Sequence, residues 1–69
     1  MNIFINGQRL ALTEKSSLER ALETFLSSKQ RQQSFALALN GRFIGKALYV
    51  STLVNEGDSV DILLPIQGG

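Results

Sequence analysis

The chain has 69 residues, of which 7 are Lys or Arg and 6 are Asp or Glu, so its formal charge is +1. This length allows one domain, and a hydrophobic content of 43% with balanced charge excludes a disordered chain and a dedicated nucleic-acid binder. The sequence contains no Cys and no His, which excludes disulfide bonds and Cys/His metal sites.

The missing residue types also restrict the chemistry. Without His or Cys, no side chain titrates near neutral pH when unperturbed, and there is no thiolate nucleophile. We therefore expect a protein that is not an enzyme and holds no metal or cofactor. No apolar run approaches the roughly 20 residues that cross a bilayer, and the first residues do not resemble a signal peptide. The expected compartment is the cytoplasm, with no membrane partner.

The first residues predict a β-hairpin. Residues 2–6 alternate between polar and apolar, and the same alternation continues over residues 8–13. Between them, Asn6-Gly7 favours a type I′ turn, because both central residues of that turn need positive φ.

One amphipathic helix is predicted next. Ser16 and Glu19 fit a capping box, with Ser16 as the N-cap and Glu19 reaching back from the third helical position. The polar run 29–33 predicts a solvated connector after the helix rather than a nucleic-acid contact. Apolar residues recur with the 3.6-residue period of one helix face, and they are Leu18, Ala21, Leu22, Phe25 and Leu26.

The second half of the chain predicts further strands. Residues 35–39 place three large apolar side chains on one face and two alanines on the other, and Asn40-Gly41 is a second turn signal before a short segment at 42–44. A turn at 56–59 precedes a last strand over residues 60–64. Residues 45–56 show no clear period, and core side chains are expected there from Leu48, Val50, Leu53 and Val54.

This order of elements, β-β-α-β-(short β)-β, predicts a two-layer α+β domain. A single amphipathic helix has to cover one face of a single mixed sheet, and a right-handed crossover sets the third strand in that sheet. Four or five strands packed on one main helix make the β-grasp architecture, with residues 1–69 as one domain and 65–69 as a flexible tail. The predicted core is Ile3, Ile5, Leu10, Leu12, Leu18, Leu22, Phe25, Leu26, Leu37, Leu39, Ile44, Val60, Ile62 and Leu64.

The sequence finishes in Pro65-Ile66-Gln67-Gly68-Gly69. Pro65 has no N–H and holds the preceding residue extended, so strand pairing is expected to fade there. Two glycines without side chains suit a segment that threads a narrow channel and presents an α-carboxylate to another protein's active site. An ATP-dependent enzyme can adenylate such a carboxylate, after which a sulfur nucleophile can displace AMP. A frayed end without function is the alternative explanation.

With these features, the chain resembles the ubiquitin-like sulfur carriers of bacteria, and in particular the thiamine-biosynthesis sulfur carriers of the ThiS family. The matching segments are residues 1–7, 36–41, 56–60 and the final Gly68-Gly69. The resemblance implies that Gly69 is the covalent site of adenylation and thiocarboxylate formation. It also implies that Gly68, Gln67 and Ile66 form the segment that threads into the partner.

The resemblance further implies the partners. An adenylyltransferase related to the ubiquitin-activating (E1-like) enzymes uses MgATP to convert the Gly69 carboxylate to an acyl-adenylate. Sulfur from a cysteine-desulfurase persulfide then replaces AMP, and thiazole synthase takes that sulfur for the thiazole ring. The carrier itself catalyses nothing, and it is expected to be a monomer when free.

Three alternatives stay open. The small subunits of molybdopterin synthase share the fold and the ending, but they tend to be longer and to carry Pro-Pro near the tail, whereas this chain has only Pro65. A non-covalent β-grasp interaction module with incidental glycines is a second alternative. A protein modifier attached to lysines is the third.

The sheet face opposite the helix is the predicted docking surface. An open apolar patch usually marks a partner site, although scattered surface hydrophobics are common. Glu56, Asp58 and Asp61 are expected to form an acidic rim that speeds encounter with a basic partner. The predicted docking residues are Phe4, Ala36, Ala38, Phe43, Leu63 and Pro65.

Overall fold

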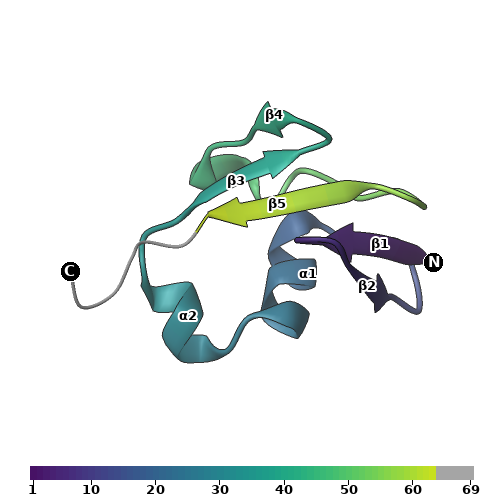
Figure 1. Ribbon diagram of the computed structural model, residues 1–69, viewed down its shortest axis with the longest axis horizontal. Helices are drawn as coiled ribbons and strands as arrows, with labels where there is room; N and C mark the ends of the chain where they lie inside the picture. Colours follow the sequence, from purple (N-terminus) through teal and green to yellow (C-terminus); the bar gives the residue numbers. More distant parts are fainter. Residues whose placement is uncertain (64–69) are drawn as a thin grey trace.

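The computed structural model describes residues 1–63 of the chain (Figure 1). The predicted core residue Leu64 and the predicted tail, Pro65 to Gly69, lie outside the described residues. In chain order the elements are β1 (Asn2–Ile5), β2 (Gln8–Ala11), α1 (Leu18–Phe25), α2 (Ser28–Gln32), β3 (Ala36–Leu39), β4 (Arg42–Phe43), the 3₁₀ helix η1 (Lys46–Leu48) and β5 (Ser59–Leu63).

The strands form one mixed sheet with the order β2-β1-β5-β3-β4. β1 runs parallel to β5, with Phe4 beside Ser59 and Ile5 beside Val60. The other neighbouring strands are antiparallel. The last described strand therefore occupies the centre of the sheet. The prediction of a mixed sheet of four or five strands in an α+β domain is confirmed, and the sheet has five.

Both Asn-Gly pairs form the turns that their sequence predicts. The φ angle is +51° at Asn6 and +80° at Gly7, and it is +51° at Asn40 and +83° at Gly41. Positive φ at both central residues defines the type I′ turn, whose twist matches that of the flanking strands. The two hairpins, β1–β2 and β3–β4, are thus set by local sequence.

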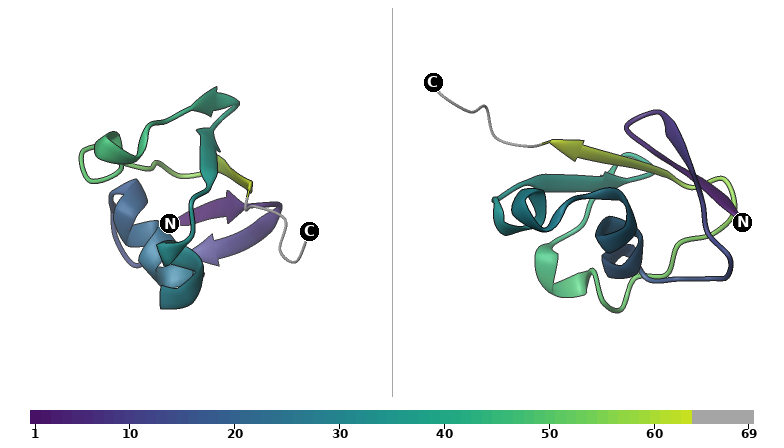
Figure 2. Two further views of the ribbon diagram at one scale, coloured as in Figure 1. Left: turned by 90° about the vertical axis from the view of Figure 1, so that its left-hand side faces the viewer. Right: turned by 90° about the horizontal axis from the view of Figure 1, so that it is seen from below.

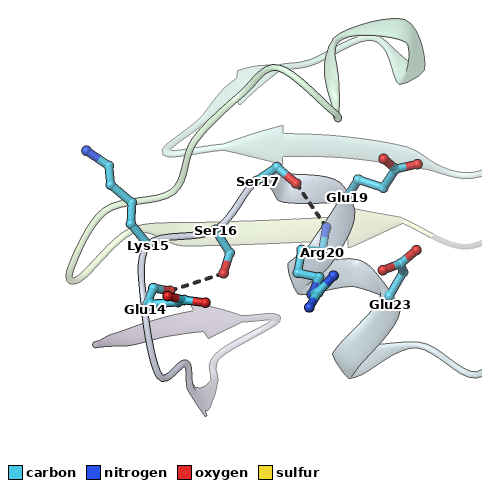
Figure 3. Close-up of a pocket in the computed structure, with 7 residues that line it drawn as sticks. All are labelled: Glu14, Lys15, Ser16, Ser17, Glu19, Arg20 and Glu23. Carbon is cyan, nitrogen blue, oxygen red and sulfur yellow. Dashed lines mark hydrogen bonds between the residues drawn. The ribbon is translucent and has the colours of Figure 1, made fainter.

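Helix α1 is capped one residue later than predicted. Ser17 is the N-cap, and its Oγ accepts a hydrogen bond of 3.2 Å from the backbone N–H of Arg20 (Figure 3). The Ser16 hydroxyl instead donates to the backbone carbonyl of Glu14 at 3.1 Å. The predicted capping box between Ser16 and Glu19 is therefore wrong.

A tertiary contact explains why the helix starts at this residue. The backbone of residues 16–18 is held in extended pairing with residues 52–54. The Leu18 N–H donates to the carbonyl of Thr52 at 2.8 Å, and the Val54 N–H donates to the carbonyl of Ser16 at 2.9 Å. Because Ser16 is fixed by this pairing, Ser17 is the first residue able to cap the helix.

The predicted connector at 29–33 is also wrong, since Ser28–Gln32 forms the short helix α2. The Ser27 Oγ accepts from the Gln30 N–H at 3.2 Å, and the Gln30 Oε1 accepts from the Ser27 N–H at 3.0 Å. This is a reciprocal capping box. Arg31 on α2 also forms an exposed ion pair of 3.9 Å with Glu23 on α1, which contributes at most about 1 kcal/mol.

The core lies between the sheet and α1. Most of the predicted core side chains are buried, while Leu10, Phe25, Leu39 and Ile44 pack against the core and are only half-buried. Tyr49 is a core residue that the prediction lacks. The buried hydrophobic residues are Ile3, Ile5, Leu12, Leu18, Ala21, Leu22, Leu26, Leu37, Tyr49, Val54, Val60 and Ile62.

Residues 45–56 contribute less to the core than predicted. Val54 is fully buried, but Leu48, Val50 and Leu53 are 55%, 65% and 53% exposed, so their assignment to the core is wrong. The large side chain that points inward is Tyr49, whose ring stacks on Phe35 with centroids 6.2 Å apart. A short 3₁₀ turn has no repeating apolar face, which is why no period marks this segment in the sequence.

The domain has two layers. Figure 2 (right) shows the helices α1, α2 and η1 on one side of β3 and β5, and no described element covers the other side of these strands. Of the helices in the described part of the chain, none is long and apolar enough to span a membrane. The uncovered side of the sheet is therefore the surface from which a site has to be built.

Candidate functional site

The open face is the side of the sheet away from the helices. Along β5, buried and exposed side chains alternate, which turns Asp61 and Leu63 outward. Strand pairing sets Ala36 beside Leu63, and it sets Ala38 between Asp61 and Phe43. The outward side chains of β1, β3, β4 and β5 that we call the open face are Phe4, Ala36, Ala38, Phe43, Ser59, Asp61 and Leu63.

Large apolar side chains of the open face are exposed to solvent. Phe43 is 73% exposed and Leu63 is 62% exposed, and they flank the small side chains of Ala36 and Ala38. The structure therefore brings these four predicted docking residues together on adjacent strands. Their role in docking stays a prediction, and Pro65 lies outside the described residues.

Phe4 lies on the same face but apart from this group. Its neighbours across the strands are Arg9 on β2 and Ser59 on β5, and its side chain is 39% exposed. A polar position on β5 thus separates Phe4 from the alanines of β3. The apolar part of the open face is centred on β3, β4 and the end of β5.

The three acidic residues expected at the rim have different surroundings. The Glu56 Oε1 accepts a hydrogen bond of 3.0 Å from the backbone N–H of Asn2. The Asp58 carboxylate accepts from the backbone N–H of Asn55 at 2.7 Å and from the Asn40 side-chain amide at 3.1 Å. Both carboxylates therefore hold loops in place rather than standing free.

Asp61 differs from these two acids. It lies on the open face itself, directly beside Ala38, and its side chain is exposed. Within residues 1–63, its carboxylate forms no ion pair and accepts no hydrogen bond. Of the three acids, Asp61 is thus the one whose carboxylate is free in the described part of the chain and lies among the apolar residues, and the acidic rim itself stays a prediction.

Asn6 fixes the end of the central strand, a role that sequence reasoning did not identify. Its side-chain Oδ1 accepts from the Ile62 N–H at 2.7 Å, and its Nδ2 donates to the Ile62 carbonyl at 3.3 Å. Through these two bonds, the Asn6 side chain pairs with the backbone of Ile62 and continues the β1–β5 pairing beyond the last backbone bonds. The pair Asn6-Gly7 already has a sufficient explanation as a turn, so no further signal in the sequence points to this contact.

The candidate covalent residue lies close to that anchored strand in the sequence. Gly69 follows Leu63 by six residues, and Gly69, Gly68, Gln67 and Ile66 are all outside the described residues. Six residues reach at most about 20 Å when fully extended. An active site that receives Gly69 therefore has to lie within that distance of the end of β5.

The helix side of the domain carries a shallow hollow of about 200 Å³. The stacked rings of Phe35 and Tyr49 line it together with Lys46 and the paired side chains of Arg31 and Glu23. Burial raises the pKa of the Tyr49 hydroxyl above its ordinary value, so this group stays neutral at physiological pH. Residues 1–63 contain no group of three His, Cys, Asp or Glu side chains placed to hold a metal ion.

Two solved structures are similar to this fold. The crystal structure of the thiamine biosynthesis protein ThiS from Geobacter metallireducens has a TM-score of 0.77 and 24% sequence identity, and the match covers 100% of both chains. An NMR solution structure of a thiamine biosynthesis protein from the same organism has a TM-score of 0.75 and 24% identity, covering 100% of this chain and 88% of that one. At this identity the likeness establishes the fold, which is the predicted ubiquitin-like β-grasp.

The sequence itself decides the family. No curated protein matches the chain. The model of the ThiS family, in contrast, matches residues 3–69, which is nearly the whole chain and includes both final glycines. On this match, the chain belongs to the ThiS family.

Proposed function

We propose that this protein is a sulfur carrier in thiamine biosynthesis and that it carries the sulfur on Gly69. The observation behind the proposal is the ThiS-family match, which extends from the first strand through Gly68 and Gly69. The fold, which is shared with a thiamine biosynthesis protein, supports it. In this role the chain is a substrate of its partner enzymes and performs no catalysis.

The proposed chemistry begins with activation of the Gly69 carboxylate. One carboxylate oxygen attacks the α-phosphorus of MgATP in the active site of the adenylyltransferase, and pyrophosphate leaves. The terminal sulfur of a cysteine-desulfurase persulfide then attacks the carbonyl carbon, and AMP leaves. A second thiol attacks the cysteine sulfur of the resulting acyl disulfide, which forms a new disulfide and releases the Gly69 thiocarboxylate. The thiocarboxylate sulfur then passes to the thiazole precursor on thiazole synthase.

We further propose that the open face docks on both enzymes. Phe43 and Leu63 are large, exposed and adjacent to alanines, which gives the compact apolar centre that protein interfaces use. Leu63 also ends the strand from which the chain continues to Gly69. Docking at this face therefore holds the origin of the reactive segment next to the partner, with Phe4 at its margin.

The experiment is a mass measurement on the intact chain. The protein is incubated with MgATP, the adenylyltransferase, a cysteine desulfurase and cysteine, and its mass is compared with that of a variant carrying one alanine after Gly69. One exchange of oxygen for sulfur in the natural chain alone is the expected result. High-mass adducts on lysines would instead identify a protein modifier. An unchanged mass would contradict the carrier role and favour a non-covalent interaction module.

A second step assigns the pathway. The thiocarboxylate form is mixed with thiazole synthase and its substrates, and recovery of the original carboxylate mass is expected. Recovery with molybdopterin synthase large subunit, and none with thiazole synthase, would assign the chain to molybdenum-cofactor synthesis.

A further inference from the structure

Asp61 is the charged member of the open face. Among the described outward residues of β1, β3, β4 and β5, the others are apolar or uncharged. Ala38 lies directly beside Asp61 on β3, with Phe43 beyond it on β4. Leu63 is two residues further along the same strand. Strand geometry sets these neighbours within roughly 10 Å of Asp61.

The carboxylate of Asp61 has no cation within the chain. It forms no ion pair within residues 1–63, and residues 64–69 contain no Lys or Arg. On the same side of the sheet, Arg9 is the outward basic residue of the neighbouring hairpin. It lies on β2, separated from β5 by β1, and makes no ion pair there. Within the described part of the chain, the exposed Asp61 carboxylate is therefore left to solvent.

Docking of a partner on the open face changes the surroundings of the Asp61 carboxylate. A partner that buries Phe43 and Leu63 also comes against Asp61, because Asp61 is two residues from Leu63 on β5 and is separated from Phe43 only by the small side chain of Ala38. Removing a charge from water without a partner costs more free energy than a small apolar contact returns. A carboxylate with a matched guanidinium or ammonium group, in contrast, keeps its charge and fixes the register of the interface.

We propose that the surface of the adenylyltransferase that covers the open face carries a basic side chain opposite Asp61, and that this charge pair selects the partner. The inference rests on the proposed function, since it takes the open face as the docking surface. It assigns Asp61 a role that Glu56 and Asp58 do not share, because their carboxylates are already bonded within the chain. The expected partner site is an apolar concavity with one cation in its centre.

Binding of variants to the adenylyltransferase without MgATP tests the proposal. Asp61→Asn keeps the shape of the side chain and removes its charge. Glu14→Gln removes the same charge from the loop beside the N-terminus of α1, on the helix side (Figure 3), and is the matched control. Asp61→Asn is expected to weaken the Kd at least about tenfold, mainly through a faster koff, because central charge pairs act on dissociation. Glu14→Gln is expected to change the Kd by no more than about twofold.

The outcomes separate this inference from the proposed function. A folded Asp61→Asn variant that binds as tightly as the natural chain, or more tightly, overturns the charge pair. Asp61→Ser serves as a second variant, and loss of folding in both would overturn the inference by giving Asp61 a structural role instead. If the natural chain binds in an Asp61-dependent way but never gains sulfur, the proposed function fails and the charge pair stands.

Discussion

The buried face of α1 and the exposed segment after β4 allow a matched test of the packing. Leu22→Ala and Leu48→Ala remove the same atoms from two positions with opposite surroundings. Leu22 is 4% exposed in the core cluster, whereas Leu48 is 55% exposed on η1. The pair therefore compares the same chemical change in the core and at the surface.

The expected magnitudes follow from this difference. Truncation of a buried leucine costs about 2–5 kcal/mol, because transfer free energy is lost and a cavity remains. A 69-residue domain has a total stability of about 3–10 kcal/mol, so Leu22→Ala removes a large fraction of it. Leu48→Ala is expected to cost less than about 1 kcal/mol, since much of its side chain is in water in both states.

Thermal and urea unfolding, followed by circular dichroism, measure both effects. A loss of about 2–5 kcal/mol corresponds to a Tm decrease of roughly 8–40 °C in a domain of this size. An unchanged Tm for Leu22→Ala would show that the helix presents a different face to the sheet. Equal losses in the two variants would show that residues 46–53 pack into the core after all.

Three further predictions concern the cap, the final glycines and the open face. Ser17→Ala should lower the free energy of unfolding by about 1 kcal/mol and Ser16→Ala by clearly less, and urea titrations that give equal losses would contradict the cap assignment. Gly68→Val should retain the natural Tm but fail to gain sulfur in the mass assay, because the added side chain obstructs the channel; normal sulfur transfer would contradict the threading argument. Phe43→Asp and Leu63→Asp should each weaken binding to the adenylyltransferase and to thiazole synthase at least about tenfold without unfolding the domain. Natural affinity in a folded Phe43→Asp variant would exclude the open face as the docking surface.

The parts of the fold that local sequence determines were predictable. The turns at Asn6-Gly7 and Asn40-Gly41 need positive φ, which Asn and Gly adopt more readily than other residues. The apolar stripe of α1 and the alternation of β5 follow from the periods of a helix and a strand. Helix α2 could also have been predicted, since Ser27 and Gln30 have the spacing of a capping box. Its polar composition, which is typical of a connector, concealed that signal.

The parts that tertiary contacts determine were not predictable. Ser16 and Ser17 are equally good caps in isolation, and the pairing of residues 16–18 with 52–54 decides between them. The same pairing and the Tyr49 ring stack determine which residues of the segment after β4 point inward. For the site, alternation was enough to place Phe43 and Leu63 on one face. The separate position of Phe4 and the free state of Asp61 depend on strand order and side-chain bonds.

The central place of β5 links the completion of folding to the proposed role of Gly69. β5 joins the sheet between β1 and β3, and its parallel pairing with β1 connects opposite ends of the described chain. Contacts between such distant segments form late, because the loop between them has to be closed first. A nascent chain that has not yet reached β5 therefore lacks both the central strand of the sheet and the residue proposed to be activated. In the function proposed above, an enzyme that recognises the sheet surface across β3, β4 and β5 would spend ATP only on folded chains.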